Sequence, residues 1–191
     1  NLPGYVVLNG GLIPSGGVDN FGSGFLPASY QGSIMQAKDP AVPNINRQES
    51  TSNLQDNKLA LLSALDNETL TRMGNHDELE SAISNYELAY KMQASVPELM
   101  DISGETEATK KLYGLDDEYP QTASYAMQCL VARRLVERGV NFVELTCSAI
   151  KGSDRWDAHG GLKFNHESNA KAVDKPIAGL LKDLKVRGLL D

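Results

Sequence analysis

The sequence predicts an α/β protein, and three observations lead to this fold class. Two short runs, residues 5–8 and 140–146, are rich in apolar, β-branched and aromatic residues, which favour strands. Between them, residues 48–138 carry apolar residues at helical spacing. After the second run, a polar loop leads into an amphipathic helix. Helix, strand, loop and helix in this order form half of a crossover unit, which is typical of a parallel sheet covered by helices.

Residues 1–8 supply the first predicted strand, and residues 9–47 read as a long irregular excursion. Glycine and proline punctuate this excursion throughout and argue against regular structure; they are Gly10, Gly11, Gly16, Gly17, Gly22, Gly24, Gly32, Pro14, Pro27, Pro40 and Pro43. Long loops inside compact domains are usually functional. The apolar side chains of Phe21, Phe25, Leu26 and Tyr30 indicate that the excursion packs on something, either its own domain or, as a lid, a substrate.

Residues 48–138 form the helical region. Two apolar stripes, which we interpret as core, run along its first half; they are Leu54, Leu61, Leu62 and Leu65, then Leu79, Ile83, Tyr86 and Tyr90. Asn75 and Glu78 resemble a capping box that opens the second helix, and Pro97 either ends that helix or begins a new turn. Shorter patterns predict helices over 105–113, closed by Gly114, and 121–138, stopped by Gly139.

Residues 139–191 contain a strand, a loop and a helix. The strand over 140–146 is short, as expected of a buried strand. The closing helix over 174–187 continues an apolar stripe that begins at Val173, and Asp174 is a plausible N-cap just before Pro176. The stripe consists of Val173, Ile177, Leu180, Leu181 and Leu184.

We interpret residues 1–191 as one incomplete domain, an internal piece of a longer protein, because the chain starts and stops inside apolar elements; a mature domain with trimmed termini is the alternative. If flanking strands are missing, the strand over 140–146 and the helix over 174–187 lack part of their cover. We therefore expect poor stability or self-association.

The composition excludes some classes of partner. The chain has a formal net charge of −7 and a pI near 5.0, which argues against a nucleic-acid partner, and no apolar run is long enough to span a membrane. Cys129 and Cys147 have neither the spacing of a zinc site nor the density of a disulfide scaffold.

The candidate site is the loop that contains Asp157 and His159, directly after the predicted strand. A carboxylate and a neutral imidazole together suit Zn²⁺, Mn²⁺ or Fe. The alternative is an aspartate that caps a turn and a histidine bonded to the backbone. His166 is close enough to return to the same centre, or enters the next helix exposed. Arg155 is the one arginine near the loop; for it, as for Arg133 and Arg134, anion binding competes with a solvated or ion-paired role.

Several longer strings carry a family resemblance across the chain. They are residues 2–8, 24–28, 30–32, 86–93, 112–114, 129–140, 156–159 and 174–181. On these strings the chain resembles the middle of a bacterial, notably planctomycete, family catalogued as domain of unknown function 1501, a sulfatase-like branch of the alkaline phosphatase superfamily.

The resemblance implies part of a three-layer α/β/α fold with a mainly helical insertion. It implies a metal-dependent hydrolase of small-molecule or polysaccharide sulfate or phosphate esters, exported or periplasmic. Asp157 and His159 would be one ligand pair for a divalent ion (zinc, manganese, calcium or magnesium), with the nucleophile outside this chain. A non-catalytic protein of the same fold, binding a glycan or a protein, is the alternative.

Overall fold

The computed structural model describes residues 2–11, 13–74, 77–150 and 156–190. In these residues the chain is a mixed α/β protein with five α-helices and a small parallel sheet. The strands are β1 (Tyr5–Leu8), β2 (Ser33–Met35) and β3 (Phe142–Leu145), in the order β2-β1-β3. Val7 lies opposite Ile34 of β2 and Glu144 of β3. The predicted α/β class is therefore confirmed.

The buried strand of the described sheet is β1. Val6, Val7 and Leu8 have no exposed surface, as expected of a parallel strand with neighbours on both sides. The strand predicted over 140–146 is shorter and more exposed than expected, since β3 pairs only with β1 in the described part of the chain and Phe142 is 58% exposed. The prediction that this strand is buried is therefore wrong for these residues.

The excursion after β1 contains a strand that the sequence analysis did not predict. β2 adds to the free side of β1 and buries Met35, and the Asn9 amide donates to the Met35 carbonyl at 2.7 Å. In the rest of its described residues, the excursion forms only two 3-10 turns, Gly17–Phe21 and Ala28–Tyr30. Phe25 is 98% exposed, whereas Phe21 is buried. Three residues are too few to show the alternation of apolar and polar residues that predicts a strand. β2 is defined by its backbone pairing with β1.

The helices are α1 (Ser52–Met73), α2 (Asp77–Met100), α3 (Glu107–Tyr113), α4 (Pro120–Glu137) and α5 (Leu162–Val186). The predicted ends of α3 and α4 are confirmed, because Gly114 and Gly139 adopt φ angles of +88° and +82°. Pro97 lies inside α2, which continues past it. Asn75, which the sequence suggested as a capping residue, lies outside the described residues.

Helix α5 begins twelve residues earlier than predicted, so Asp174 is not an N-cap and Pro176 is internal. A contact with α4 holds α5 on the N-terminal side of the proline. Pro176 leaves the Ala172 carbonyl without its helical partner, and the Thr122 hydroxyl of α4 donates at 2.8 Å to the neighbouring Lys171 carbonyl. The first turns of α5 are anchored by Asn165, which is buried and donates to the Gly160 carbonyl at 2.7 Å.

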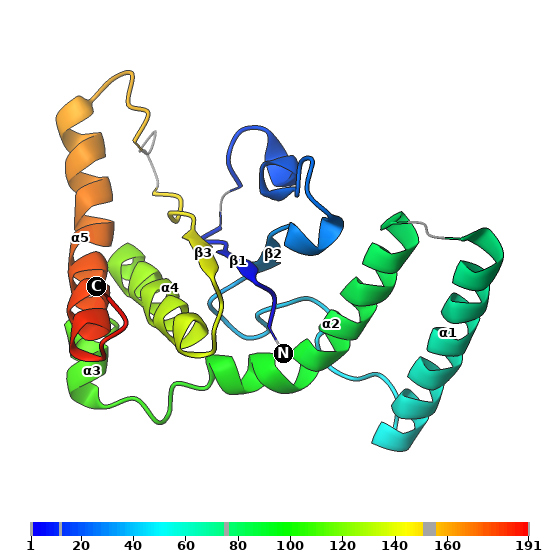
Figure 1. The fold of residues 1–191 in the computed structure, drawn as a ribbon. Helices are drawn as coiled ribbons and strands as arrows, with labels where there is room; N and C mark the ends of the chain where they lie inside the picture. Colours follow the sequence, from blue (N-terminus) through cyan, green and yellow to red (C-terminus); the bar gives the residue numbers. More distant parts are fainter. Residues whose placement is uncertain (1, 12, 75–76, 151–155, 191) are drawn as a thin grey trace.

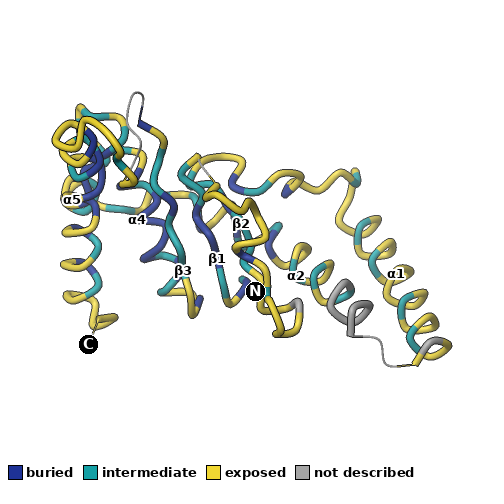
Figure 2. Tube along the Cα trace, turned by 90° about the horizontal axis from the view of Figure 1, so that it is seen from above, coloured by how far each residue is buried: buried dark blue, intermediate teal, exposed yellow. Residues whose placement is uncertain are grey.

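Helix α4 lies between the sheet and α5 (Figure 1). One side of α4 packs with β1, β2 and the end of α2, through residues that include Val131 and Leu135. Its other side packs with α3 and α5, through Cys129 and Leu130. Figure 2 shows this buried centre and, at one end, the largely exposed hairpin of α1 and α2.

The prediction that the first two helical stripes are core is wrong for most of their described residues. Six of these side chains are 40% to 71% exposed: Leu54, Leu61, Leu62, Leu65, Tyr86 and Tyr90. Helical spacing shows that a helix has an apolar side but not what covers that side.

Arg133 and Arg134 of α4 hold the helices together, so the ion-paired role is the one observed. Arg133 is 3% exposed and pairs with Glu105 (2.6 Å), Glu137 (2.6 Å) and Asp183 of α5 (3.3 Å). Arg134 pairs with Glu105 at 2.8 Å and also donates at 2.8 to 2.9 Å to the carbonyls at the end of α2, those of Glu98, Leu99 and Asp101. Cations there satisfy carbonyls that lack helical partners.

This network predicts a stability that depends on pH. Burial acts to raise the pKa of Glu105, but Arg133 and Arg134 outweigh it and hold the pKa below its ordinary value of 4.5. A carboxylate with a depressed folded pKa adds stability that is fully present above its unfolded pKa and is lost as pH falls through the folded one. Glu105→Gln should therefore lower the free energy of unfolding by about 1 to 3 kcal/mol at neutral pH.

The difference between the wild-type protein and Glu105→Gln should shrink below about pH 4.5, which urea denaturation over a pH series measures. Glu118→Gln, at an exposed carboxylate, is the control. An unfolding free-energy difference that stays constant through the acid range would contradict the assignment.

Candidate functional site

Asp157 and His159 lie together in the loop between β3 and α5. The Asp157 Oδ1 and His159 Nε2 atoms are 3.2 Å apart, and the two side chains are 89% and 84% exposed. The pair projects from the loop that precedes α5 and is not buried among core residues. The two side chains predicted from the sequence as metal ligands thus lie within contact distance of each other.

The two additional site residues suggested by the sequence are His166 and Arg155. His166 is exposed on the second turn of α5, as in the second of the two predicted placements, and its ring centroid lies 6.1 Å from that of Trp156. Arg155 lies outside the described residues. Within the described ranges, no group of three or more His, Cys, Asp or Glu side chains is placed to hold a metal ion.

A second polar region, not predicted from the sequence, lies at the carboxyl end of β1. A cleft of about 260 Å³ opens there between the strand ends and α4. Its lining combines backbone, amide, hydroxyl and ammonium groups: Asn9, Gly10, Gly11, Gln36, Ala37, Lys38, Ser124, Met127 and Gln128. The sequence Asn-Gly-Gly directly after an apolar strand is the signal from which this cleft could have been predicted.

The topology of the sheet explains the position of this cleft. β1 is flanked by β2 on one side and by β3 on the other, so the chain leaves β1 towards one neighbour and returns on the opposite side. At such a switch point the connections diverge, and ligands of open α/β sheets bind in the crevice beyond the strand ends. The loops after β1 and β3 rise on the same side of the sheet (Figure 1).

Side-chain hydrogen bonds fix the diverging strand ends. The Gly10 amide donates to Thr146 Oγ1 at 2.9 Å, and the Gly11 amide donates to Asn9 Oδ1 at 2.8 Å. Gln128 is buried, and its amide, oriented by the hydrogen bonds available to it, donates to the carbonyls of Leu8 and Thr146 at 3.0 and 3.1 Å. One side chain of α4 thus bridges the ends of β1 and β3, which gives the cleft a rigid floor.

Two further groups lie near the cleft, a pair of serine hydroxyls and a buried cysteine thiol. Ser124 of the cleft and Ser148 of the loop after β3 lie 3.3 Å apart, between their hydroxyl oxygens, so the cleft contacts the first part of that loop. Cys129 is buried, and burial, with a smaller effect from Cys147, raises the pKa of its thiol to about 12. The Cys129 thiol is therefore protonated at neutral pH and is not a nucleophile.

The fold and site define a mixed α/β protein with a parallel sheet and polar groups at the carboxyl ends of its strands. The whole chain, residues 1–191, matches the family described as protein of unknown function (DUF1501), and the chain belongs to that family. Neither a search of curated proteins nor one of solved structures finds a match. In the described residues, no helix has the length and apolar character needed to cross a membrane.

The close approach at Gly10 predicts a substitution effect. A Cβ at this position would fall well inside the contact distance of the Thr146 carbonyl oxygen and 2.9 Å from the Gln128 amide. Gly10→Ala should force the strand ends apart and lower the free energy of unfolding by about 2 kcal/mol. Thermal and urea denaturation measure this loss. At Gly4, where a Cβ would meet nothing within 4 Å, the alanine variant serves as the control; equal effects at both positions would contradict the close approach.

Proposed function

We propose that the chain is part of a metal-dependent hydrolase of sulfate or phosphate esters, from a sulfatase-like branch of the alkaline phosphatase superfamily. The observation that carries this proposal is the 3.2 Å approach of the Asp157 carboxylate to the His159 imidazole on an exposed loop after a parallel strand. The resemblance of the chain to that branch supports it, and on the same resemblance we propose an exported or periplasmic protein.

The two side chains fit a divalent ion. A carboxylate oxygen and an imidazole nitrogen each bind Zn²⁺ at about 2.0 to 2.2 Å, and two such ligands of one ion stand about 3 Å apart. Zinc, manganese, calcium or magnesium is the proposed ion, and when bound it would polarise an ester oxygen or lower the pKa of a bound water. Asp157 and His159 would hold the ion from one side.

The cleft at the end of β1 is the proposed place for the polar part of the ester. The Lys38 ammonium, the Ser124 hydroxyl and the Asn9 side chain line it, and these groups suit an anionic or hydroxyl-rich ligand. A small-molecule or polysaccharide ester is the proposed substrate. The Ser124 and Ser148 contact joins this cleft to the first part of the loop that follows β3.

A second candidate function is a non-catalytic protein of the same fold that binds a glycan or another protein. The observation that favours it is a groove of about 860 Å³ between α1 and α2, well away from the strand ends. A binding protein of this kind would use the hairpin and would not require a metal ion at Asp157.

Metal analysis of the full-length protein distinguishes the two functions. Equilibrium dialysis followed by elemental analysis should find divalent metal in stoichiometric amount, and Asp157→Ala or His159→Ala should lower the affinity for it by about tenfold to a hundredfold or more, because each removes one ligand. Hydrolysis of an aryl sulfate or aryl phosphate should fall in the same variants.

Asp174→Ala, which removes an exposed carboxylate from α5, is the matched control and should leave metal content unchanged. Full-length protein that is free of metal, or that keeps its metal in both ligand variants, would overturn the hydrolase proposal and leave the binding function.

A further inference from the structure

The hairpin of α1 and α2 carries an open apolar groove. Its apolar lining comes from both helices and is incompletely covered: Leu59, Leu62, Ile83, Tyr86 and Tyr90, of which Leu62, Tyr86 and Tyr90 are 43%, 71% and 40% exposed. An apolar groove rimmed by polar residues is typical of an interaction surface.

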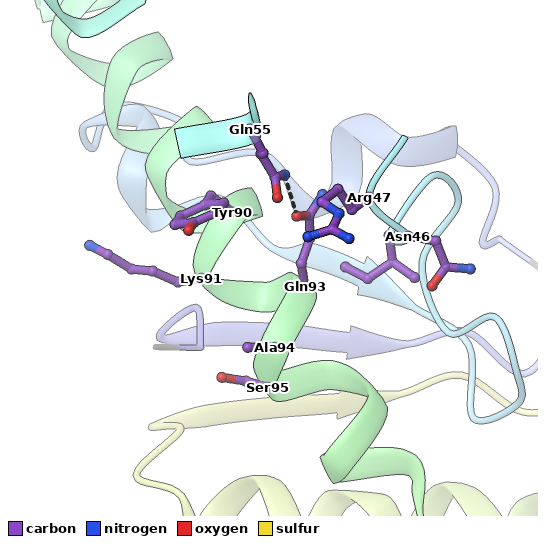
Figure 3. Close-up of a pocket in the computed structure, with 9 residues that line it drawn as sticks. Asn46, Arg47, Gln55, Tyr90, Lys91, Gln93, Ala94 and Ser95 are labelled. Carbon is purple, nitrogen blue, oxygen red and sulfur yellow. Dashed lines mark hydrogen bonds between the residues drawn. The ribbon is translucent and has the colours of Figure 1, made fainter. Parts of the chain in front are cut away.

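One end of the groove is closed by a polar contact. Gln55 of α1 donates to Gln93 of α2 at 2.6 Å, and a second hollow of about 570 Å³, which reaches the loop with Asn46 and Arg47, adjoins it (Figure 3). From this contact the groove runs between residues 55–66 of α1 and residues 83–93 of α2. A groove between two helices accepts the side-chain ridge of a third helix.

The charges along the groove are mainly negative. Asp56 and Asp66 of α1 and Glu87 of α2 line it, against the single ammonium of Lys91. By sequence, α1 and α2 together carry eight acidic and three basic residues. The chemistry that suits this groove is therefore a helix with apolar residues on one side and basic residues beside them.

Helix α5 presents such a surface on the side that faces away from α4. Ile177 and Leu181, one turn apart, are 39% and 48% exposed, and the exposed Lys182 and Lys185 flank them. Residues four apart form a ridge on a helix. The two lysines outnumber the exposed carboxylate of Asp174, so this surface is complementary to the groove in charge and offers apolar side chains to its apolar lining.

The groove and the outer side of α5 lie at opposite ends of the molecule, with the sheet and α4 between them (Figures 1 and 2). A molecule therefore cannot place its own α5 in its own groove. We propose that the outer side of α5 of one copy docks in the α1–α2 groove of a second copy, which gives head-to-tail self-association. The contact joins two different surfaces, so it extends into chains unless a ring closes.

Sedimentation velocity over a concentration series tests this contact. The wild-type chain should associate, and both Leu62→Glu in the groove and Leu181→Glu on α5 should raise the dissociation constant at least tenfold. Leu61→Glu, an exposed neighbour outside the groove lining, and Leu162→Glu, at the far end of α5, are matched controls and should associate like wild type. Circular dichroism checks that each variant folds.

Mixing the two defective variants gives the decisive measurement. Leu62→Glu keeps an intact α5 and Leu181→Glu keeps an intact groove, so their equimolar mixture should form a one-to-one dimer that does not grow further. Asp66→Lys, which leaves the apolar lining in place, should also weaken association, and added salt should weaken it in the wild-type chain. A monomer at all concentrations, equal effects in the controls, or a mixture that stays monomeric would each overturn the proposal.

Discussion

The ion pairs of Arg133 constrain most of the described fold. Its buried guanidinium contacts Glu105 before α3, Glu137 on its own helix and Asp183 on α5, and Tyr113 donates to the same Asp183 at 2.9 Å. A buried charge that loses a partner is strongly destabilising, so these elements dock in an arrangement that keeps every carboxylate in place. Arg134, the next residue, extends the constraint to the end of α2.

This constraint also bears on the position of the candidate site residues. α4 holds α5 in place through Arg133 and Thr122, and α5 is the helix that directly follows the loop with Asp157 and His159. The same helix α4 contributes Gln128 and Ser124 to the cleft beyond β1. One central helix therefore lines the cleft and also holds the helix that follows Asp157 and His159.

Much of the local structure could be predicted from the sequence. Gly114 and Gly139 mark the ends of α3 and α4 because a residue with positive φ ends a helix, and a β-branched run marks β1. Asp157 and His159 could be paired from their spacing alone. β2 could not be predicted, because three residues show no pattern. The start of α5 was missed because Pro176 favours a helix start, whereas the helix continues through it, with residues on both sides of the proline, such as Ala172 and Leu180, packed against α4.

The α/β class, the family resemblance, the C-terminal ends of α3 and α4 and the residue types available for chemistry could be predicted from the sequence, because they depend on local backbone preferences and on residue identity. The tertiary structure decided which apolar stripes are covered: those of α4 are core, whereas those of α1 stay exposed. It also decided that Arg133 is an internal ion-pair partner and that the strand ends enclose a cleft. Burial and electrostatic pairing depend on which distant segments meet, and helical spacing does not encode that information.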